Sequence, residues 1–239
     1  MTNPTEIKSK VKDAFIFYRP RDVVSGDFYW FYENKETGVL TLAAIDCTGH
    51  GVPGAFMTVM TNSILNQIVR ENGIEDPAKI LTLLDKKLEE TFSSDAKRKD
   101  GMDIGIFSID KNKKILNYAA AKLDLCLIRN NEVQRIKANR YPIGNMATKK
   151  NKVEEKNFET HTIHYQKDDM FYLYSDGFPD QFGGEENKKF MSRRFREFLL
   201  EYHYLSCEEQ EGKLQAALEM WKGDLKQTDD ILVIGVKVE

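Results

Sequence analysis

The chain has 239 residues, of which 41% are hydrophobic and 31% are charged. This composition is typical of one large globular domain and excludes a disordered or fibrous chain. The 35 basic and 38 acidic residues give a net charge of −3, without the basic excess of a nucleic-acid-binding protein. No apolar run approaches the length of a membrane span, and the first residues do not read as a signal peptide, so we expect a cytoplasmic protein without membrane contact from this chain.

Short apolar and aromatic runs bounded by turn residues predict a series of β-strands. The expected strands are 14–18, 27–32, 39–45, 102–109, 115–120, 125–129, 132–136, 160–165, 170–174 and 231–238. Several of them follow one another as hairpins, which favours antiparallel pairing over a strict alternation of strands and helices.

Helices are predicted in pairs between these groups of strands. Phe56, Met60, Ile64 and Ile68 recur every four positions, which predicts a helix packed on a core through that stripe. Three further helices are predicted: one begins after Asp76, and the other two lie around 195–202 and 214–221. We therefore predict one layered α/β domain over residues 14–239, preceded by a lead-in of residues 1–13.

The cysteines Cys47, Cys126 and Cys207 lie far apart in the sequence, and no two of them form a C-x-x-C pair. An odd number of separated cysteines is typical of reduced thiols in a cytosolic protein. The pattern therefore predicts neither disulfides nor a structural zinc site.

Aspartates recur at one kind of place, the end of an apolar strand beside a turn. They are Asp27, Asp46, Asp176 and the pair Asp229 and Asp230. Like charges about 4 Å apart repel by about 4 kcal/mol at an effective dielectric constant of 20, so carboxylates gathered at one rim of a sheet need cations. Hard oxygen ligands favour Mg²⁺ or Mn²⁺, and a pair of such ions can activate water for attack on a phosphate ester. The alternative is that each is an ordinary turn aspartate.

Four segments carry a resemblance to a known family: RPRDVVSGDFYWF, AAIDCTGHGVPGAFM, YLYSDGFPDQFGG and QTDDILVIGVKV. In this order they resemble the SpoIIE-type (RsbU-like) phosphatases of bacteria, which belong to the PPM superfamily of metal-dependent serine/threonine phosphatases. The resemblance covers about residues 14–238. It implies an α/β (α+β) fold, a four-layer α-β-β-α sandwich with two central, mostly antiparallel sheets flanked by helix pairs.

The resemblance also implies a site for two divalent cations, Mn²⁺ or Mg²⁺, at one end of the sandwich. The implied metal ligands are Asp27, Asp46 as the bridge between both ions, the backbone carbonyl of Cys47, Asp176 and Asp229, with Asp230 as the competing choice for the last. His50 is a candidate proton donor to the leaving group, although a structural role in the turn is the alternative. Arg21 is a candidate phosphate-binding residue through its guanidinium, and an exposed arginine without such a role is the alternative.

The leading hypothesis is a protein serine/threonine phosphatase, a phosphoric monoester hydrolase that uses metal-activated water in bacterial signalling. The resemblance implies a phosphoprotein substrate such as a phosphorylated STAS-domain anti-anti-sigma factor, and it allows a sensor domain upstream. A second hypothesis is a conditionally active or inactive PPM-fold module that binds a signalling partner. A two-metal nuclease or phosphodiesterase is a third, disfavoured by the absence of a basic stripe.

Overall fold

The computed structural model describes residues 7, 10–11, 13–49, 51–92, 101–144 and 156–239. Two five-stranded sheets form the centre of the fold, and every pair of neighbouring strands in them is antiparallel. The first sheet has the order β1-β12-β9-β6-β7, and the second has the order β2-β3-β4-β5-β8. Chain order is not sheet order, because the first and last long strands pair with each other.

The strands of the first sheet are β1 (Asp13–Arg19), β12 (Ile231–Lys237), β9 (Met170–Tyr174), β6 (Leu125–Arg129) and β7 (Glu132–Ile136). Those of the second sheet are β2 (Asp27–Glu33), β3 (Leu40–Cys47), β4 (Met102–Asp110), β5 (Ile115–Ala121) and β8 (His161–His164). A small separate hairpin pairs β10 (Phe182–Gly183) with β11 (Lys188–Lys189).

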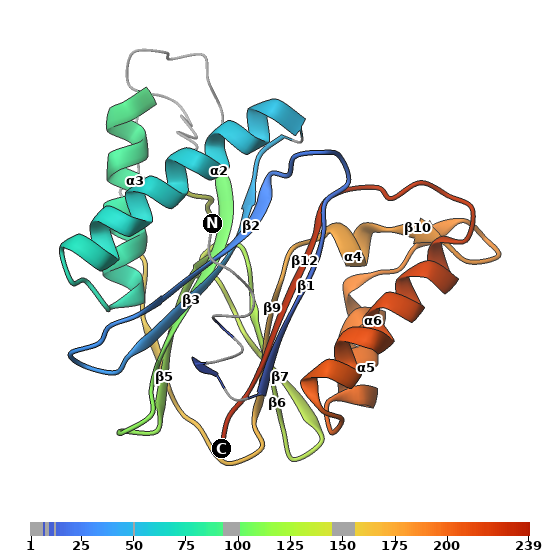
Figure 1. The fold of residues 1–239 in the computed structure, drawn as a ribbon. Coiled ribbons are helices and arrows are strands. Elements are labelled where there is room, and N and C mark those ends of the chain that lie inside the picture. The colour runs from blue at the N-terminus through green and yellow to red at the C-terminus, as the bar shows by residue number, and fades with distance from the viewer. Residues whose placement is uncertain (1–6, 8–9, 12, 50, 93–100, 145–155) are drawn as a thin grey trace.

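Helices cover the outer face of each sheet (Figure 1). The helical elements are α2 (Gly51–Leu65), the π-helical turn η1 (Asn66–Glu71), α3 (Pro77–Phe92), α4 (Gly177–Asp180), α5 (Ser192–Tyr202) and α6 (Cys207–Lys222). The pair α2 and α3 lies on the second sheet, and the pair α5 and α6 lies on the first. The resulting four layers confirm the expected α-β-β-α sandwich.

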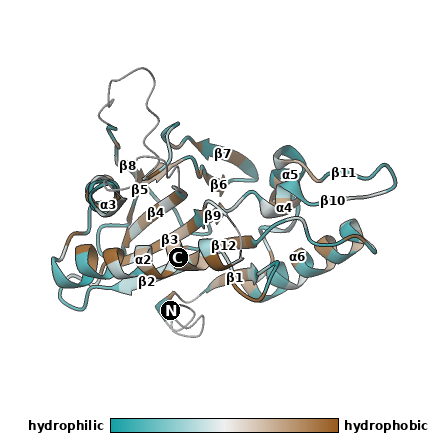
Figure 2. Ribbon diagram, turned by 90° about the horizontal axis from the view of Figure 1, so that it is seen from above, coloured by the Kyte–Doolittle hydropathy of each residue, from teal (hydrophilic) through white to brown (hydrophobic). Residues whose placement is uncertain are grey.

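Three apolar clusters hold the four layers together, one at each interface. The cluster between the two sheets includes Phe107 and Phe171, and the cluster beneath α2 and α3 includes Trp30. The third packs α5 and α6 onto the first sheet around Phe178 and Phe195, whose ring centroids lie 4.6 Å apart. Seen from above, the strands between the two helix pairs are largely brown, the colour of hydrophobic residues (Figure 2). Strands buried on both faces explain the continuous apolar runs of the sequence.

The turn between β6 and β7 explains why the sequence predicts the bounds of these two strands correctly. β6 and β7 occupy 125–129 and 132–136, as expected, because the two residues between them are Asn130 and Asn131. Both have positive φ angles, 52° and 60°, which a two-residue hairpin turn requires and asparagine tolerates. This hairpin places Leu125 opposite Ile136.

The predicted contact face of α2 is confirmed at Met60 and Ile64, and at Ile68 in η1, which pack on the cluster beneath the helix, and is wrong at Phe56. Phe56, at 62% exposure, and Val59, at 63%, point to solvent instead of packing on the core. The buried face of the helix carries Gly54 and Thr58, and Thr58 donates a hydrogen bond to the backbone carbonyl of Gly26 at 3.3 Å. A close backbone contact and polar bonds therefore position the first turns of this helix, while Met57 and Leu65 pack on the apolar cluster.

The three cysteines are free thiols and all are buried, as the sequence predicts. Burial raises the pKa of the Cys126 thiol to about 12, which keeps it protonated and unreactive at neutral pH. Among the described residues, no helix combines the length and the apolar character that crossing a membrane requires.

Two glycines give a matched test of the packing. A Cβ on Gly235 of β12 would lie 2.1 Å from the ring of the fully buried Phe15, whereas a Cβ on Gly212 of α6 would meet nothing within 4 Å. We expect Gly235→Ala to lower the free energy of unfolding by about 1–3 kcal/mol through overpacking. Gly212→Ala should raise it by about 0.5–1 kcal/mol through helix propensity. Urea denaturation measures both, and a Gly235→Ala protein as stable as the wild type would contradict this packing.

Candidate metal centre

Strand register brings three aspartates into one row at the end of the second sheet. Asp27 is the first residue of β2 and faces Asp46 near the end of β3. Asp46 in turn faces Asp103 on β4. The uninterrupted apolar run of β3 ends at Asp46, so this carboxylate lies where the buried strand meets the rim of the sheet.

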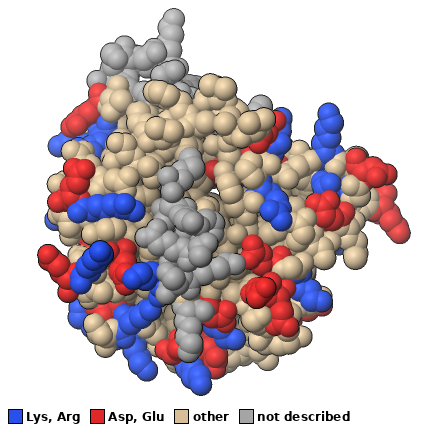
Figure 3. All heavy atoms as spheres, in the orientation of Figure 1, with Lys and Arg blue, Asp and Glu red and all other residues tan. Residues whose placement is uncertain are grey.

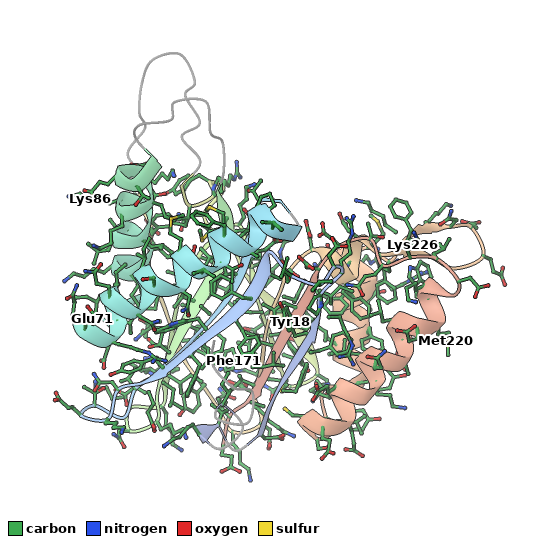
Figure 4. The ribbon with its side chains drawn as sticks, turned by 45° about the horizontal axis from the view of Figure 1, so that its top comes forward. Tyr18, Glu71, Lys86, Phe171, Met220 and Lys226 are labelled. Carbon is green, nitrogen blue, oxygen red and sulfur yellow. The ribbon has the colours of Figure 1, made fainter. Side chains whose placement is uncertain are left out.

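Asp176 and Asp229 reach the same place from the first sheet. Asp176 follows β9 and precedes α4, and Asp229 lies just before β12. The charges of both residues act on Asp46 and raise its pKa, after burial and the charge of Asp27. A direct bond also joins the two sheets here, because the Ser175 hydroxyl donates to Oδ2 of Asp27 at 2.6 Å. Oxygen-tipped side chains are drawn together where the first turn of α2 comes near β12 and α4 (Figure 4).

The four aspartates proposed as ligands from the sequence therefore meet at one end of the sandwich. Burial raises the pKa of Asp27 to about 7, with Asp230 adding to the effect and the Ser175 hydrogen bond opposing it. Burial and neighbouring carboxylates raise the pKa of Asp46 to about 9. Both shifts have one physical cause, negative charge held away from water without enough cations nearby.

The structure distinguishes Asp229 from Asp230. Asp230 is 4% exposed, and both its carboxylate oxygens accept bonds from backbone amides, Oδ1 from Arg21 and Oδ2 from Gly26, each at 2.8 Å. These bonds fix the loop that leads into Asp27. Asp229 is exposed, and its carboxylate accepts a local bond from the amide of Asp230. Asp229 is thus the member of the pair whose carboxylate is available to a ligand.

A close backbone approach shapes the turn after β3. A Cβ on Gly26 would lie 2.6 Å from the carbonyl oxygen of Gly49 and 2.9 Å from that of Cys47. A Cβ on Gly54 would lie 2.3 Å from the same Gly49 oxygen. Glycine is required at both positions, because any side chain would push apart the loop before β2 and the first turn of α2.

The remaining predicted site residues differ in what the structure shows. The carbonyl of Cys47 lies in this crowded turn, while its thiol is buried in the apolar cluster beneath α2. Arg21 is exposed beside the Asp229 segment, and its Nη1 donates to the carbonyl of Thr228 at 3.1 Å. His50 lies outside the described residues.

The donor set at this end of the sandwich suits hard divalent cations. It consists of carboxylate and carbonyl oxygens, and its raised carboxyl pKa values show an excess of negative charge that a cation would relieve. Within the described part of the chain, no three His, Cys, Asp or Glu side chains already converge on one point. The residues therefore fit such ions in chemistry and location.

Asp103 and Ser175 are members of the site to which the sequence assigned no role. Asp103 adds to the charge on Asp46, and Ser175 holds Asp27 while its own Oγ accepts from the amide of Leu232. The sequence signal that could have indicated Asp103 is its position in the segment GMDIG, at the end of a predicted strand. Its partner could not be read from the sequence, because two helices separate β3 from β4.

With this geometry in view, the relatives of the chain can be compared with it. The family model for stage II sporulation protein E (SpoIIE) matches residues 36–239. The chain belongs to the SpoIIE family. SpoIIE-type proteins are PPM phosphatases, whose activity depends on metal ions. The matched residues include Asp46, Asp176 and Asp229, whereas Asp27 precedes them.

Individual relatives agree with this membership. The SiaA-PP2C domain of Pseudomonas aeruginosa is 31% identical, with a TM-score of 0.87 over 98% of this chain and 90% of that domain. Phosphoserine phosphatase RsbP of Bacillus subtilis (strain 168) is 24% identical over 168 residues, 69% of this chain. The match spans 39% of RsbP. RsbX in complex with magnesium shares the fold, with 16% identity and a TM-score of 0.63 over 94% of each chain.

Asp46→Asn tests the charge excess directly. The folded chain holds protons on Asp46 and Asp27 that the unfolded chain, with ordinary carboxyl pKa values near 3.8, releases. Stability in EDTA should therefore fall as the pH rises from about 4 to about 9. At pH 8, Asp46→Asn should raise the free energy of unfolding by about 1–3 kcal/mol and flatten this dependence. Urea titrations across pH measure both. Asp224→Asn, an exposed control, should behave as the wild type, and a less stable Asp46→Asn protein would contradict the expectation.

Asp229 and Asp230 should respond in opposite ways to alanine. Asp230→Ala removes the acceptor of two backbone amides and should lower the free energy of unfolding by about 2–4 kcal/mol. Asp229→Ala, at an exposed position, should change it by less than about 1 kcal/mol while weakening Mn²⁺ binding. Denaturation and metal titration calorimetry on the same samples separate the two effects. Equal destabilisation by both variants would contradict the distinction.

Proposed function

We propose that this protein is a metal-dependent phosphatase that hydrolyses phosphoserine or phosphothreonine in a protein substrate. The observation that carries the proposal is that Asp27 faces Asp46 in the strand register and that the charges of Asp176 and Asp229, from the other sheet, also act on Asp46. Membership of the SpoIIE family and the printed activity of RsbP, a phosphoserine phosphatase, support the reaction class.

The proposed cofactor is a pair of divalent cations, Mn²⁺ or Mg²⁺. Asp46 is the proposed bridge, because it has a carboxylate neighbour on each side in the strand register. Asp27, Asp176, Asp229 and the carbonyl of Cys47 are the other proposed ligands. Bound cations of this kind supply Lewis-acid activation of water and offset the negative charge of the phosphate.

The protein's own groups hold this arrangement in place. Ser175 orients Asp27 through its hydroxyl, and Asp230 fixes the backbone that leads into Asp27. The guanidinium of Arg21, which bonds the carbonyl of Thr228 next to Asp229, is the proposed contact for a phosphate oxygen. The bond to the Thr228 carbonyl uses one N–H donor of the guanidinium, so other N–H donors remain for a phosphate oxygen.

The substrate is proposed to be a phosphoprotein, with a STAS-domain protein as the type implied by the family resemblance. Residues 14–239 are the proposed catalytic domain, which would act in the cytoplasm and could be controlled by an upstream sensor. Basic and acidic side chains are interspersed over the face drawn in Figure 3. That pattern supports a protein substrate over a nucleic acid, whose backbone would favour a basic surface.

Hydrolysis assays test the proposal. An aryl phosphate and a phosphoserine peptide should be hydrolysed with Mn²⁺ or Mg²⁺ and not in EDTA. Asp46→Asn should lose about 100-fold or more of kcat/KM, while Asp224→Asn should keep it. Turnover in EDTA, a fully active Asp46→Asn protein, or hydrolysis of a diester without any monoester activity would contradict the proposed function.

A further inference from the structure

A groove leads away from the aspartate cluster along the ends of β6 and β7. It consists of two adjoining cavities of about 320 and about 500 Å³, which share Lys122, Asp124 and Arg135 as lining residues. The smaller cavity also contacts Asp176 and Arg196, and the larger one continues to Lys137, Asn139 and Arg140. The groove thus reaches Asp176 of the proposed catalytic site, and its larger cavity extends to the exposed residues Lys137 and Arg140.

The groove is cationic although the protein as a whole is acidic. Its lining contains five basic residues, Lys122, Arg135, Lys137, Arg140 and Arg196. The acidic residues of the lining are Asp103, Asp124 and Asp176. Asp176 lines the smaller cavity, Asp103 lines the larger one, and Asp124 lines both, so basic residues outnumber acidic ones in each cavity.

The outer basic side chains are available to a ligand. Arg135 donates to Asp124, whose other oxygen accepts from the amide of Ala138 at 2.8 Å. Lys137 and Arg140 are exposed, and neither has an ion pair with any residue that the structure describes. Within the described residues, these two positive charges at the open end of the groove have no acidic partner.

Lys122 marks the junction between the groove and the aspartates. Its ammonium lies 3.7 Å from Oδ1 of Asp103. Its backbone has a φ angle of 65°, a left-handed conformation that costs a lysine free energy and that glycine or asparagine adopts more readily. Strained residues of this kind concentrate at functional sites.

The ion pair with Asp103 does not account for a lysine at this position. The Lys122 side chain is 46% exposed, and exposed pairs stabilise proteins little. A lysine there does place a cation within reach of both the aspartate cluster and an anion lying in the groove. The geometry therefore favours a role in binding over a role in stability.

We propose that this groove binds an acidic segment of the phosphoprotein substrate, so that the enzyme prefers a phosphoserine flanked by aspartate or glutamate. Lys122 and Arg196 lie nearest the reacting phosphate, and Lys137 and Arg140 contact flanking carboxylates. This selectivity rests on the proposed phosphatase function and adds the chemical class of the substrate to it.

The test compares two phosphoserine peptides that differ only in having aspartates or asparagines on both sides of the phosphoserine. The wild type should hydrolyse the aspartate peptide about tenfold more efficiently, by kcat/KM, in Mn²⁺. The preference should shrink when the ionic strength rises from about 0.05 to about 0.5 M, because the outer contacts are exposed. The rate on an aryl phosphate, which has no flanking residues, normalises each sample.

Variants locate the preference in the groove. The double variant Lys137→Gln with Arg140→Gln should lower the ratio of the two peptide efficiencies by about fivefold. Lys86→Gln is the matched control, since Lys86 is exposed on α3 and points away from the sheets (Figure 4). It should keep the wild-type ratio.

Lys122→Gly separates binding from folding. Glycine suits the left-handed backbone, so the variant should unfold at or above the wild-type temperature. The same change should reduce kcat/KM for the aspartate peptide by about tenfold. A loss of activity in a fully stable protein is a result that a merely structural lysine would not produce.

The outcomes distinguish the two proposals. Equal efficiencies for the two peptides, or a preference that survives the double variant, overturn the groove assignment while aryl phosphate turnover upholds the phosphatase. Absence of turnover on every phosphomonoester overturns the phosphatase. In that case fluorescence anisotropy with the same labelled peptides still decides the groove: tighter binding of the aspartate peptide supports it, and equal binding overturns it.

Discussion

Asp27 and Asp46 face each other across the β2–β3 ladder, with Asp103 continuing the row on β4. Carboxylates this close and this far from water repel one another, and burial raises their pKa values. The apolar layers around them must therefore hold a local arrangement that is unfavourable without cations. Divalent ions bound at the proposed site would relieve this repulsion.

The surrounding structure restrains these carboxylates by specific bonds and close contacts. Ser175 reaches Asp27 from the other sheet, and Asp230 accepts two backbone amides of the loop before it. Gly26 and Gly54 allow that loop and the first turn of α2 to approach closely. The two sheets are thus joined at the site by polar bonds, in addition to the apolar cluster between them.

Opposite charges lie side by side at this end of the molecule. The aspartates are suited to cations, while the groove beginning at Lys122 is suited to an anion. The proposed phosphoprotein substrate would carry both its phosphate and its flanking side chains into this region. With acidic residues at its centre and basic residues along the groove, such a site can use the first for hydrolysis and the second for selecting the substrate.

The sequence by itself determined the strands, the pairing of helices, the strand-end aspartates and the family, because these depend on local patterns and on short motifs. Only the tertiary structure decided that Asp103 faces Asp46, that Asp230 is committed to backbone amides, and that Phe56 of α2 points outward. It also placed Arg196 of α5 and Lys122 on the lining of one cavity. Each of these facts depends on register and packing between segments far apart in the chain, which no local pattern encodes.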